Sequence, residues 1–298
     1  MASTRIAHIS DLHLAPLPDN TGPKNFKQFL GYLSWKSKRQ YRHSEHVLNL
    51  LKEDIRTHKF DHICVSGDQT NLGTEKEFRN SSIWMQGIGA PEKVSVIPGN
   101  HDAYGNKHYE LSKLYWSPWM LDRDSHGVGL PFVRQVGNVA VIGVSSAVWT
   151  APFMANGRVT PAHYEALEES LASLDEDSSL YKMLMIHHPP LAKVTSWRRG
   201  LRDVKQFQEL LIKHGVDMVL YGHLHKPLRH KLIYNNKEML FLGAASASSN
   251  GYHASPAQYY SMEIDQQDGQ WTVDIKSRAY NPEKDRFEQT DLPTEQTI

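Results

Sequence analysis

Short apolar runs alternate along the chain with longer segments whose apolar residues recur at helical spacing. One such segment places Val47, Leu48, Leu51 and Ile55 on a single face. This strand–helix–strand alternation predicts an α/β fold with parallel strands and right-handed crossovers. Six apolar runs have the length of buried strands: residues 4–10, 60–66, 94–97, 138–144, 181–186 and 216–221.

Helix starts are marked by residues that cap backbone N–H groups. Ser44 predicts a helix through His58, and Thr74 opens a capping box with Glu77. Thr160 followed by proline, and Asp203, begin two more helices. The period then changes to that of strands, with a hairpin turn at Asp268-Gly269. The predicted C-terminal strands are residues 232–234, 239–243, 259–264 and 271–275.

No Pro-, Ser- or Gly-rich linker divides the 298 residues, so a single domain spanning 1–298 is predicted. Residues 16–43 form an expected insert with a short helix, basic and aromatic between 24 and 42. This segment either contacts an anionic lipid surface or phosphorylated substrate, or is a packed helix with a solvated basic face. Residues 103–131 are expected to be irregular and aromatic, forming a cap near the site or a satellite cluster. A polar, mobile tail is expected after residue 281.

Composition narrows the class of protein. The formal net charge is zero, which argues against a general nucleic-acid binder. Cys64 is the only cysteine and lies in an apolar run, so no intrachain disulfide is possible and a reducing compartment fits. The N-terminus lacks the apolar segment of a signal peptide, and no run reaches the roughly 18 apolar residues of a membrane span. A cytoplasmic protein is therefore expected.

Polar side chains with metal-binding atoms follow the strand-like runs. They combine carboxylate, amide and imidazole donors without a thiolate, a set that suits manganese, iron or zinc. Each motif alone is also compatible with a solvated turn, but together they exceed what one tetrahedral ion needs. They fit two divalent ions about 4 Å apart that share one carboxylate. The candidate ligands are Asp11, His13, Asp68, Asn100, His187, His223 and His225.

These motifs resemble those of the calcineurin-like metallophosphoesterases, from residue 6 to about 250. The resemblance rests on Asp11-x-His13, Gly67-Asp68, Gly99-Asn100-His101-Asp102, His187 and Gly222-His223-x-His225. It implies two facing mixed β-sheets in a sandwich flanked by helices, with a dinuclear centre at the strand ends. In this pattern Asp11, His13 and His225 bind one ion, Asn100, His187 and His223 bind the other, and Asp68 bridges.

The same resemblance implies two catalytic residues. His101 lies near the leaving group, and Asp102 is expected to hydrogen-bond His101 and fix its orientation. His188, next to the ligand His187, is expected either to support the ligands or simply to neighbour them. The chain departs from the family after Asp68, where Gln69-Thr70-Asn71 replaces a common Leu/Ile-Thr-Asp, and this bears on substrate contacts only.

Within the family the sequence is most similar to bacterial cyclic-nucleotide and glycerophosphodiester phosphodiesterases. This implies hydrolysis of cyclic nucleotides or similar small diesters by a hydroxide held between the two ions, with His101 assisting the leaving group. One alternative is a pyrophosphatase of a nucleotide-linked lipid, of the UDP-diacylglucosamine type, and another is a non-catalytic metal-binding scaffold. The C-terminal hairpin would allow a homodimer by pairing across a two-fold axis. The candidate substrate contacts are Asn71, Arg198, Arg199 and Arg202.

Overall fold

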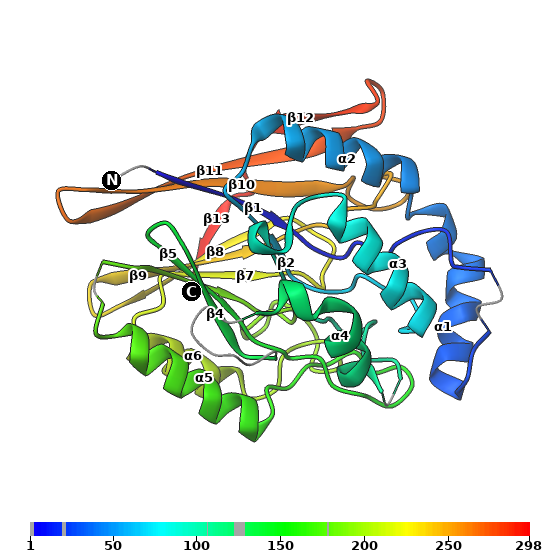
Figure 1. The fold of residues 1–298 in the computed structure, drawn as a ribbon, viewed down its shortest axis with the longest axis horizontal. Helices are drawn as coiled ribbons and strands as arrows, with labels where there is room; N and C mark the ends of the chain where they lie inside the picture. Colours follow the sequence, from blue (N-terminus) through cyan, green and yellow to red (C-terminus); the bar gives the residue numbers. More distant parts are fainter. Residues whose placement is uncertain (1–2, 20–21, 106, 122–128, 178) are drawn as a thin grey trace.

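Two β-sheets lie face to face, and helices cover both outer sides (Figure 1). The computed structural model describes residues 3–19, 22–105, 107–121, 129–177 and 179–298. The predicted α/β sandwich is confirmed. In the part of the chain that is described, no helix is both long and apolar enough to span a bilayer.

The first sheet has the strand order β12-β11-β10-β1-β2-β3. Its strands β1, β2 and β3 run parallel, as the alternation of strands and helices predicts, and β10 pairs antiparallel with β1. The bounds are β1 (Thr4–Ile9), β2 (His62–Val65), β3 (Val94–Val96), β10 (Gln258–Gln267), β11 (Gln270–Asn281) and β12 (Arg286–Thr290).

The second sheet has the order β13-β8-β9-β7-β6-β5-β4. Strands β5, β6, β7 and β9 are parallel, whereas β4 and β8 pair antiparallel with β5 and β9. The bounds are β4 (Phe132–Val136), β5 (Val139–Gly143), β6 (Tyr181–Met185), β7 (Met218–Tyr221), β8 (Leu228–Tyr234), β9 (Lys237–Gly243) and β13 (Glu295–Thr297).

The continuous apolar runs reflect burial on both faces of the central strands. In β6, Met183 packs into the core between the sheets, while Leu184 faces the opposite way into a second cluster under α5 (Pro161–Leu174) and α6 (Val204–Lys213). The same division separates Val141 from Ile142 in β5. The helices are α1 (Phe26–Ser37), α2 (Glu45–His58), α3 (Glu75–Gln86), α4 (His108–Trp116), α5 (Pro161–Leu174) and α6 (Val204–Lys213).

Several local expectations were wrong. The segment expected to be irregular contains α4, although residues 106 and 122–128 lie outside the described residues. The tail expected to be mobile after residue 281 contains β12 and β13, which pair with β11 and β8. Asp203 precedes α6 as predicted, but its side chain makes no capping hydrogen bond. The sequences of β12 and β13 are polar and did not predict strands, because pairing at the edge of a sheet needs no apolar alternation.

The insert is packed against the rest of the molecule. Residues 20–21 lie outside the described part, and α1 begins after Asn25, whose side chain accepts a hydrogen bond from the Gln28 backbone N–H. Gln28 donates from its side chain to the carbonyl of Leu72 at 3.0 Å, and Trp35 is buried. The face of α1 that carries these contacts therefore holds the insert beside the carboxyl ends of β1 and β2.

Candidate metal centre

All seven predicted ligands lie just beyond the carboxyl ends of strands, where α/β sheets place their sites. Asp11 follows β1 and Asp68 follows β2, and the backbone N–H of Asp11 donates to Gly67 O at 3.0 Å. The side chains of six of the seven are buried, and His225 is about one-third exposed. The predicted convergence is therefore seen in the structure.

Left-handed backbone aims these side chains inward. Five of the seven ligands have positive φ: Asp11, His13, Asp68, His223 and His225, with values between 39° and 72°. Such conformations are uncommon for residues other than glycine and concentrate at functional sites. The neighbouring glycines allow close approach, since a Cβ on Gly99 would collide with the Asp68 carboxylate, and one on Gly222 with Asp11.

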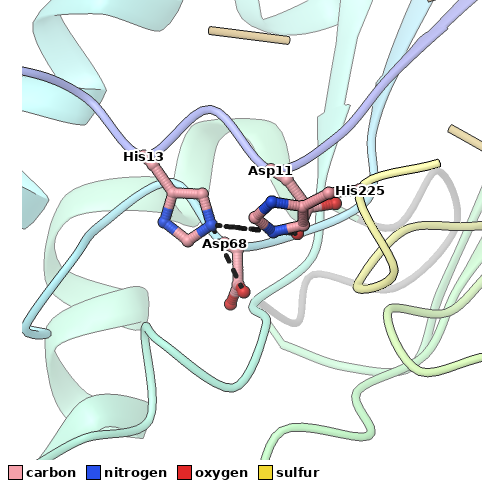
Figure 2. Close-up of side chains that lie close together, drawn as sticks. All are labelled: Asp11, His13, Asp68 and His225. Atoms are coloured by element: carbon pink, nitrogen blue, oxygen red, sulfur yellow. Dashed lines mark hydrogen bonds and ion pairs between the residues drawn. The ribbon is translucent and has the colours of Figure 1, made fainter. Parts of the chain in front are cut away.

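The first group of ligands joins Asp11, His13, Asp68 and His225 (Figure 2). Their candidate ligand atoms all lie within 4.8 Å of one another. His225 Nε2 is 3.0 Å from Asp11 Oδ1, and His13 Nε2 is 3.2 Å from His225 Nε2 and 3.8 Å from Asp68 Oδ2. Two imidazole nitrogens and two carboxylate oxygens thus face one small volume.

The second group joins Asp68, Asn100, His187 and His223. His187 Nε2 lies 3.3 Å from Asp68 Oδ2 and 3.2 Å from Asn100 Oδ1. His223 Nδ1 is 2.7 Å from the same amide oxygen. Asp68 Oδ2 therefore faces both groups, which is the arrangement of a carboxylate shared between two ions.

Backbone carbonyls orient two of the imidazole rings. His13 Nδ1 is 3.2 Å from Thr70 O, and His187 Nδ1 is 2.8 Å from Ser66 O. Since a carbonyl only accepts, each Nδ1 carries a proton, and Nε2 is the ring nitrogen that faces the centre. This is the usual way in which outer partners fix the tautomer of a metal-binding histidine.

Electrostatics favour a positive occupant. Burial disfavours ionisation of Asp68, but the adjacent His187 and His101 outweigh it and hold the pKa of this carboxyl well below its usual range. Burial likewise opposes a charge on His187, yet Asp68 beside it raises the pKa of His187 to about 9. In the metal-free protein a proton on His187 thus balances the Asp68 carboxylate.

The donor set fits divalent ions on structural grounds. Asp11 Oδ1 is buried and accepts no hydrogen bond from the described residues, and His13 Nε2 and His225 Nε2 lie only 3.2 Å apart. Buried polar atoms without partners are costly, and a cation in each group would satisfy them. Mixed oxygen and nitrogen ligation without thiolate matches manganese, iron and zinc alike.

His101 lies beside the first group, with its ring centre 4.8 Å from that of His13 and stacked on Tyr104. The prediction that Asp102 orients this ring was wrong. The Asp102 carboxylate accepts from the backbone N–H groups of Gly99 and Thr70 at 2.8 and 2.9 Å, whereas His101 Nδ1 lies 2.9 Å from Asn71 O. Asp102 therefore holds together the loops that carry Asp68 and Asn100.

The predicted substrate contacts are separated by the fold. Asn71 is buried, and its side-chain NH₂ group donates to Leu14 O at 2.9 Å, which occupies the donor end of this amide. Arg198 lies over the Trp197 ring, and Arg202 lines a different cavity, between α5 and α6. Of the four, the structure brings only Arg199 into a cavity lined by the ligand His225.

Three residues near the centre were not predicted as functional. Arg39 Nη1 of the insert lies 3.0 Å from His101 Nδ1, and the ring of His43 is centred 4.6 Å from that of His13. Ser146 Oγ bonds His188 Nδ1 at 2.8 Å, which holds the His188 ring 4.6 Å from His223. His188 thus packs behind the ligands, whereas the placement of Arg39 and His43 depends on long-range folding that leaves no local signal.

The calcineurin-like phosphoesterase family model matches residues 4–227, which include all seven ligands and His101. The chain belongs to the calcineurin-like phosphoesterase family. Membership implies a hydrolase of phosphoesters, and with the two ligand groups it supports a dinuclear divalent-metal centre.

Two curated relatives of this phosphoesterase carry more specific names. It is 24% identical over 174 residues to a probable cyclic nucleotide phosphodiesterase of Vesicomyosocius okutanii, a match covering 57% of this chain and 65% of the relative. It is 25% identical over 173 residues to a probable glycerophosphodiester phosphodiesterase GpdQ of Arcobacter nitrofigilis, covering 56% and 58%. The matches span less than two thirds of either relative's length.

Solved structures share the fold at low identity. A dimetal phosphatase from Danio rerio superposes with a TM-score of 0.59 at 12% identity, covering 93% of this phosphoesterase and 99% of that chain. A purple acid phosphatase from yellow lupin gives 0.59 at 14% identity, covering 97% and 53%. At these identities the likeness concerns the fold alone.

Proposed function

We propose that this protein is a phosphodiesterase that hydrolyses small diesters, such as cyclic nucleotides or glycerophosphodiesters, at a dinuclear centre. One observation carries the proposal: seven donors from five strand exits converge in two groups that share Asp68, with His101 beside them. Names of the two curated relatives support the diester class. Manganese and iron are the proposed ions, with zinc as the alternative.

The chain's residues have distinct roles in this reaction. Bound divalent ions would activate a water and neutralise charge on the phosphoryl oxygens. Asn71 O engages His101 Nδ1, which leaves Nε2 to deliver a proton to the leaving oxygen. Burial lowers the pKa of His101 to about 4, so the ring is neutral in the free protein. An anionic diester beside it favours the protonated ring, which couples proton donation to substrate binding.

Turnover of bis-p-nitrophenyl phosphate by protein reconstituted with manganese tests the proposal. We expect His101→Ala to retain its ions and lose about 10²- to 10⁴-fold in kcat, the usual contribution of a general acid. His46→Ala is the control, because His46 is an exposed histidine paired with Asp285. If His101→Ala lost metal yet kept its turnover per bound ion, the role given to His101 would be wrong. A panel including cyclic AMP and glycerophosphodiesters then ranks the natural substrates.

A second candidate function is hydrolysis of a nucleotide-linked lipid at the same centre. It is favoured by the outer face of α1, where Phe26, Phe29 and Leu33 are exposed at helical spacing beside basic residues. Exposed apolar side chains next to lysines suit a membrane surface. The other face of α1 holds Gln28 and Trp35 in the packed interior.

The two functions are separated by changing only the exposed face of the helix. Deleting residues 24–42 would also remove Arg39 and its contact with His101, so point substitutions are cleaner. A Phe26→Ser, Phe29→Ser, Leu33→Ser variant should lose turnover of UDP-diacylglucosamine in vesicles while sparing bis-p-nitrophenyl phosphate, if lipid is the substrate. Equal activity of variant and parent on the vesicles would remove the lipid candidate.

A further inference from the structure

We propose that a cavity beside the first group of ligands is a second anion subsite, which binds a phosphate carried on one arm of the diester substrate. The inference rests on the proposed phosphodiesterase function and specifies its substrate class. The cavity is about 370 Å³, within the range of small-molecule sites. Its ionisable lining consists of Arg39, Arg42, His43, Arg199, Lys226 and histidines 225 and 253.

The cavity collects positive charge without a matching carboxylate. None of its described lining residues is Asp or Glu. Within the described ranges, no ion pair involves Arg39, Arg42, Arg199 or Lys226. Cations gathered in this way repel one another, and an anion bound among them relieves that repulsion. Guanidinium groups match the geometry of phosphate oxygens, which favours phosphate as the anion.

The cavity adjoins the reacting centre. His225 lines the cavity, and its Nε2 is also one of the ligand atoms of the first group. His43 forms the wall between them, since its ring lies 4.6 Å from that of His13 and 6.1 Å from that of His225. Arg39, which lines the cavity, also borders His101, since its Nη1 lies 3.0 Å from His101 Nδ1. A substrate held at the centre therefore has one arm within reach of the cavity.

The segment that carries Arg39, Arg42 and His43 is fixed to the loop of residues 246–250. The backbone N–H of Asn250 donates to Arg42 O at 2.9 Å, and that of Ser44 donates to Ser248 O at 2.9 Å. His43 Nδ1 and Ser248 Oγ lie 2.7 Å apart, and Ser246 Oγ donates to Asp11 O at 2.7 Å. The insert is thereby fastened to the loop behind the ligands, so the subsite is formed before substrate binds, which favours affinity.

Two substrates that differ by one phosphate test the subsite. The p-nitrophenyl ester of thymidine 5′-phosphate and its 3′-phosphorylated derivative share the same scissile diester and chromophore. We expect the parent enzyme to show at least about tenfold higher kcat/KM on the 3′-phosphorylated substrate, the effect of one or two charge-assisted hydrogen bonds. Arg42→Gln and Arg199→Gln should each reduce this ratio severalfold, and the double variant should bring it close to one.

Lys38→Gln is the matched control, because Lys38 is an exposed cation of the same insert that does not line the cavity. It should keep both the ratio and the activity. Calorimetric binding of thymidine 3′,5′-bisphosphate and thymidine 5′-phosphate, neither of which is a diester, to manganese-reconstituted protein gives a second readout, in which the bisphosphate should bind at least about tenfold more tightly.

The outcomes separate this inference from the proposed function. Turnover of both thymidine substrates with a ratio near one in the parent enzyme overturns the subsite and leaves the phosphodiesterase intact. Absence of turnover on these and on bis-p-nitrophenyl phosphate overturns the phosphodiesterase, and the calorimetry then decides the subsite. A ratio that survives in the double variant also overturns the assignment of Arg42 and Arg199.

Discussion

Asp68 is the side chain on which both groups of ligands depend. Its Oδ2 lies 3.8 Å from His13 Nε2 and 3.3 Å from His187 Nε2, so it faces one member of each group. Its Oδ1 accepts from the backbone N–H of His101 at 2.7 Å, which also positions His101. His225, in contrast, belongs to the first group only and reaches the surface.

This difference predicts unequal effects on metal content. Asp68→Ala should bring the bound stoichiometry from about two ions toward zero, because each ion loses its shared carboxylate. His225→Ala should remove about one ion, because the second group keeps its donors. Elemental analysis after dialysis against trace metal measures the number of ions bound per chain in each variant. Equal loss in the two variants would contradict a shared role for Asp68.

At this scale the sequence was most informative where side chains follow parallel strands. Asp11, Asp68 and Asn100 were predictable because strand ends of one sheet meet at one edge. Arg39 lies 62 residues from His101, and His43 lies 205 residues from Ser248, so neither contact has a local signal. Asp102 was misassigned because adjacency in sequence does not show where a short carboxylate points.

The loop that follows β3 depends on Asp102. This buried carboxylate accepts from Gly99 N, Thr70 N and Thr70 Oγ1 at 2.8 to 2.9 Å. It thereby ties the loop after β2, which carries Asp68, to the loop after β3, which carries Asn100. Two of the three donors are backbone N–H groups of buried residues, and each becomes costly if the acceptor is removed.

Asp102→Ala should therefore lower the free energy of unfolding by roughly 2–4 kcal/mol, since two backbone donors lose their acceptor. Metal affinity should fall as well, because the two ligand-bearing loops are released. Urea denaturation of the metal-free protein measures the first effect. The control is Asp274→Ala on β11, an exposed carboxylate paired with Lys276, for which a change below about 1 kcal/mol is expected. If Asp102→Ala were as stable as the parent protein, Asp102 would not be what connects the loops after β2 and β3.

The elements themselves were predictable to differing degrees. The buried strands and the capped helices were found because burial on two faces and N-caps leave clear patterns, as at Ser44 and Thr160. β11 was predicted only as residues 271–275, because its exposed positions are polar, yet it extends from Gln270 to Asn281. β12 and β13 were missed since each pairs at the edge of a sheet with few apolar residues.

On the scale of the whole molecule, the last strands connect the two sheets. β12 extends the first sheet and β13 the second, so the chain crosses between the layers in its final residues (Figure 1).

The packed layers also bury titratable groups in a neutral form. His62 in β2 and His8 in β1 are fully buried, bonded through Nε2 to Ser95 Oγ and Ser66 Oγ at 2.8 Å.

These histidines predict a loss of stability in mild acid. Burial, assisted by Arg134, lowers the pKa of His62 to about 3. Between pH 6.5 and 3 the unfolded chain binds a proton that the native His62 does not, so falling pH favours unfolding. From pH 7.5 to 5.0 the cost at this residue is about 2 kcal/mol.

Denaturant unfolding of the metal-free protein across this range checks the prediction. A His62→Gln variant should show a flatter dependence of stability on pH, whatever its absolute stability, because the group that titrates only on unfolding has been removed. Val65→Ala in β2, the strand that carries His62, removes no titratable group and should keep the slope of the parent protein. Parallel slopes for the parent protein and His62→Gln would rule out this contribution.

The left-handed backbone at five ligands has a consequence for the lifetime of the protein. Each such residue costs on the order of 1–3 kcal/mol, and ions bound to these five ligands would offset that cost. Bound ions would therefore stabilise the ligand-bearing loops at this edge of the sandwich. Starvation for metal should open these loops first and expose them to proteases, so the abundance of the protein in a cell would follow its metal supply.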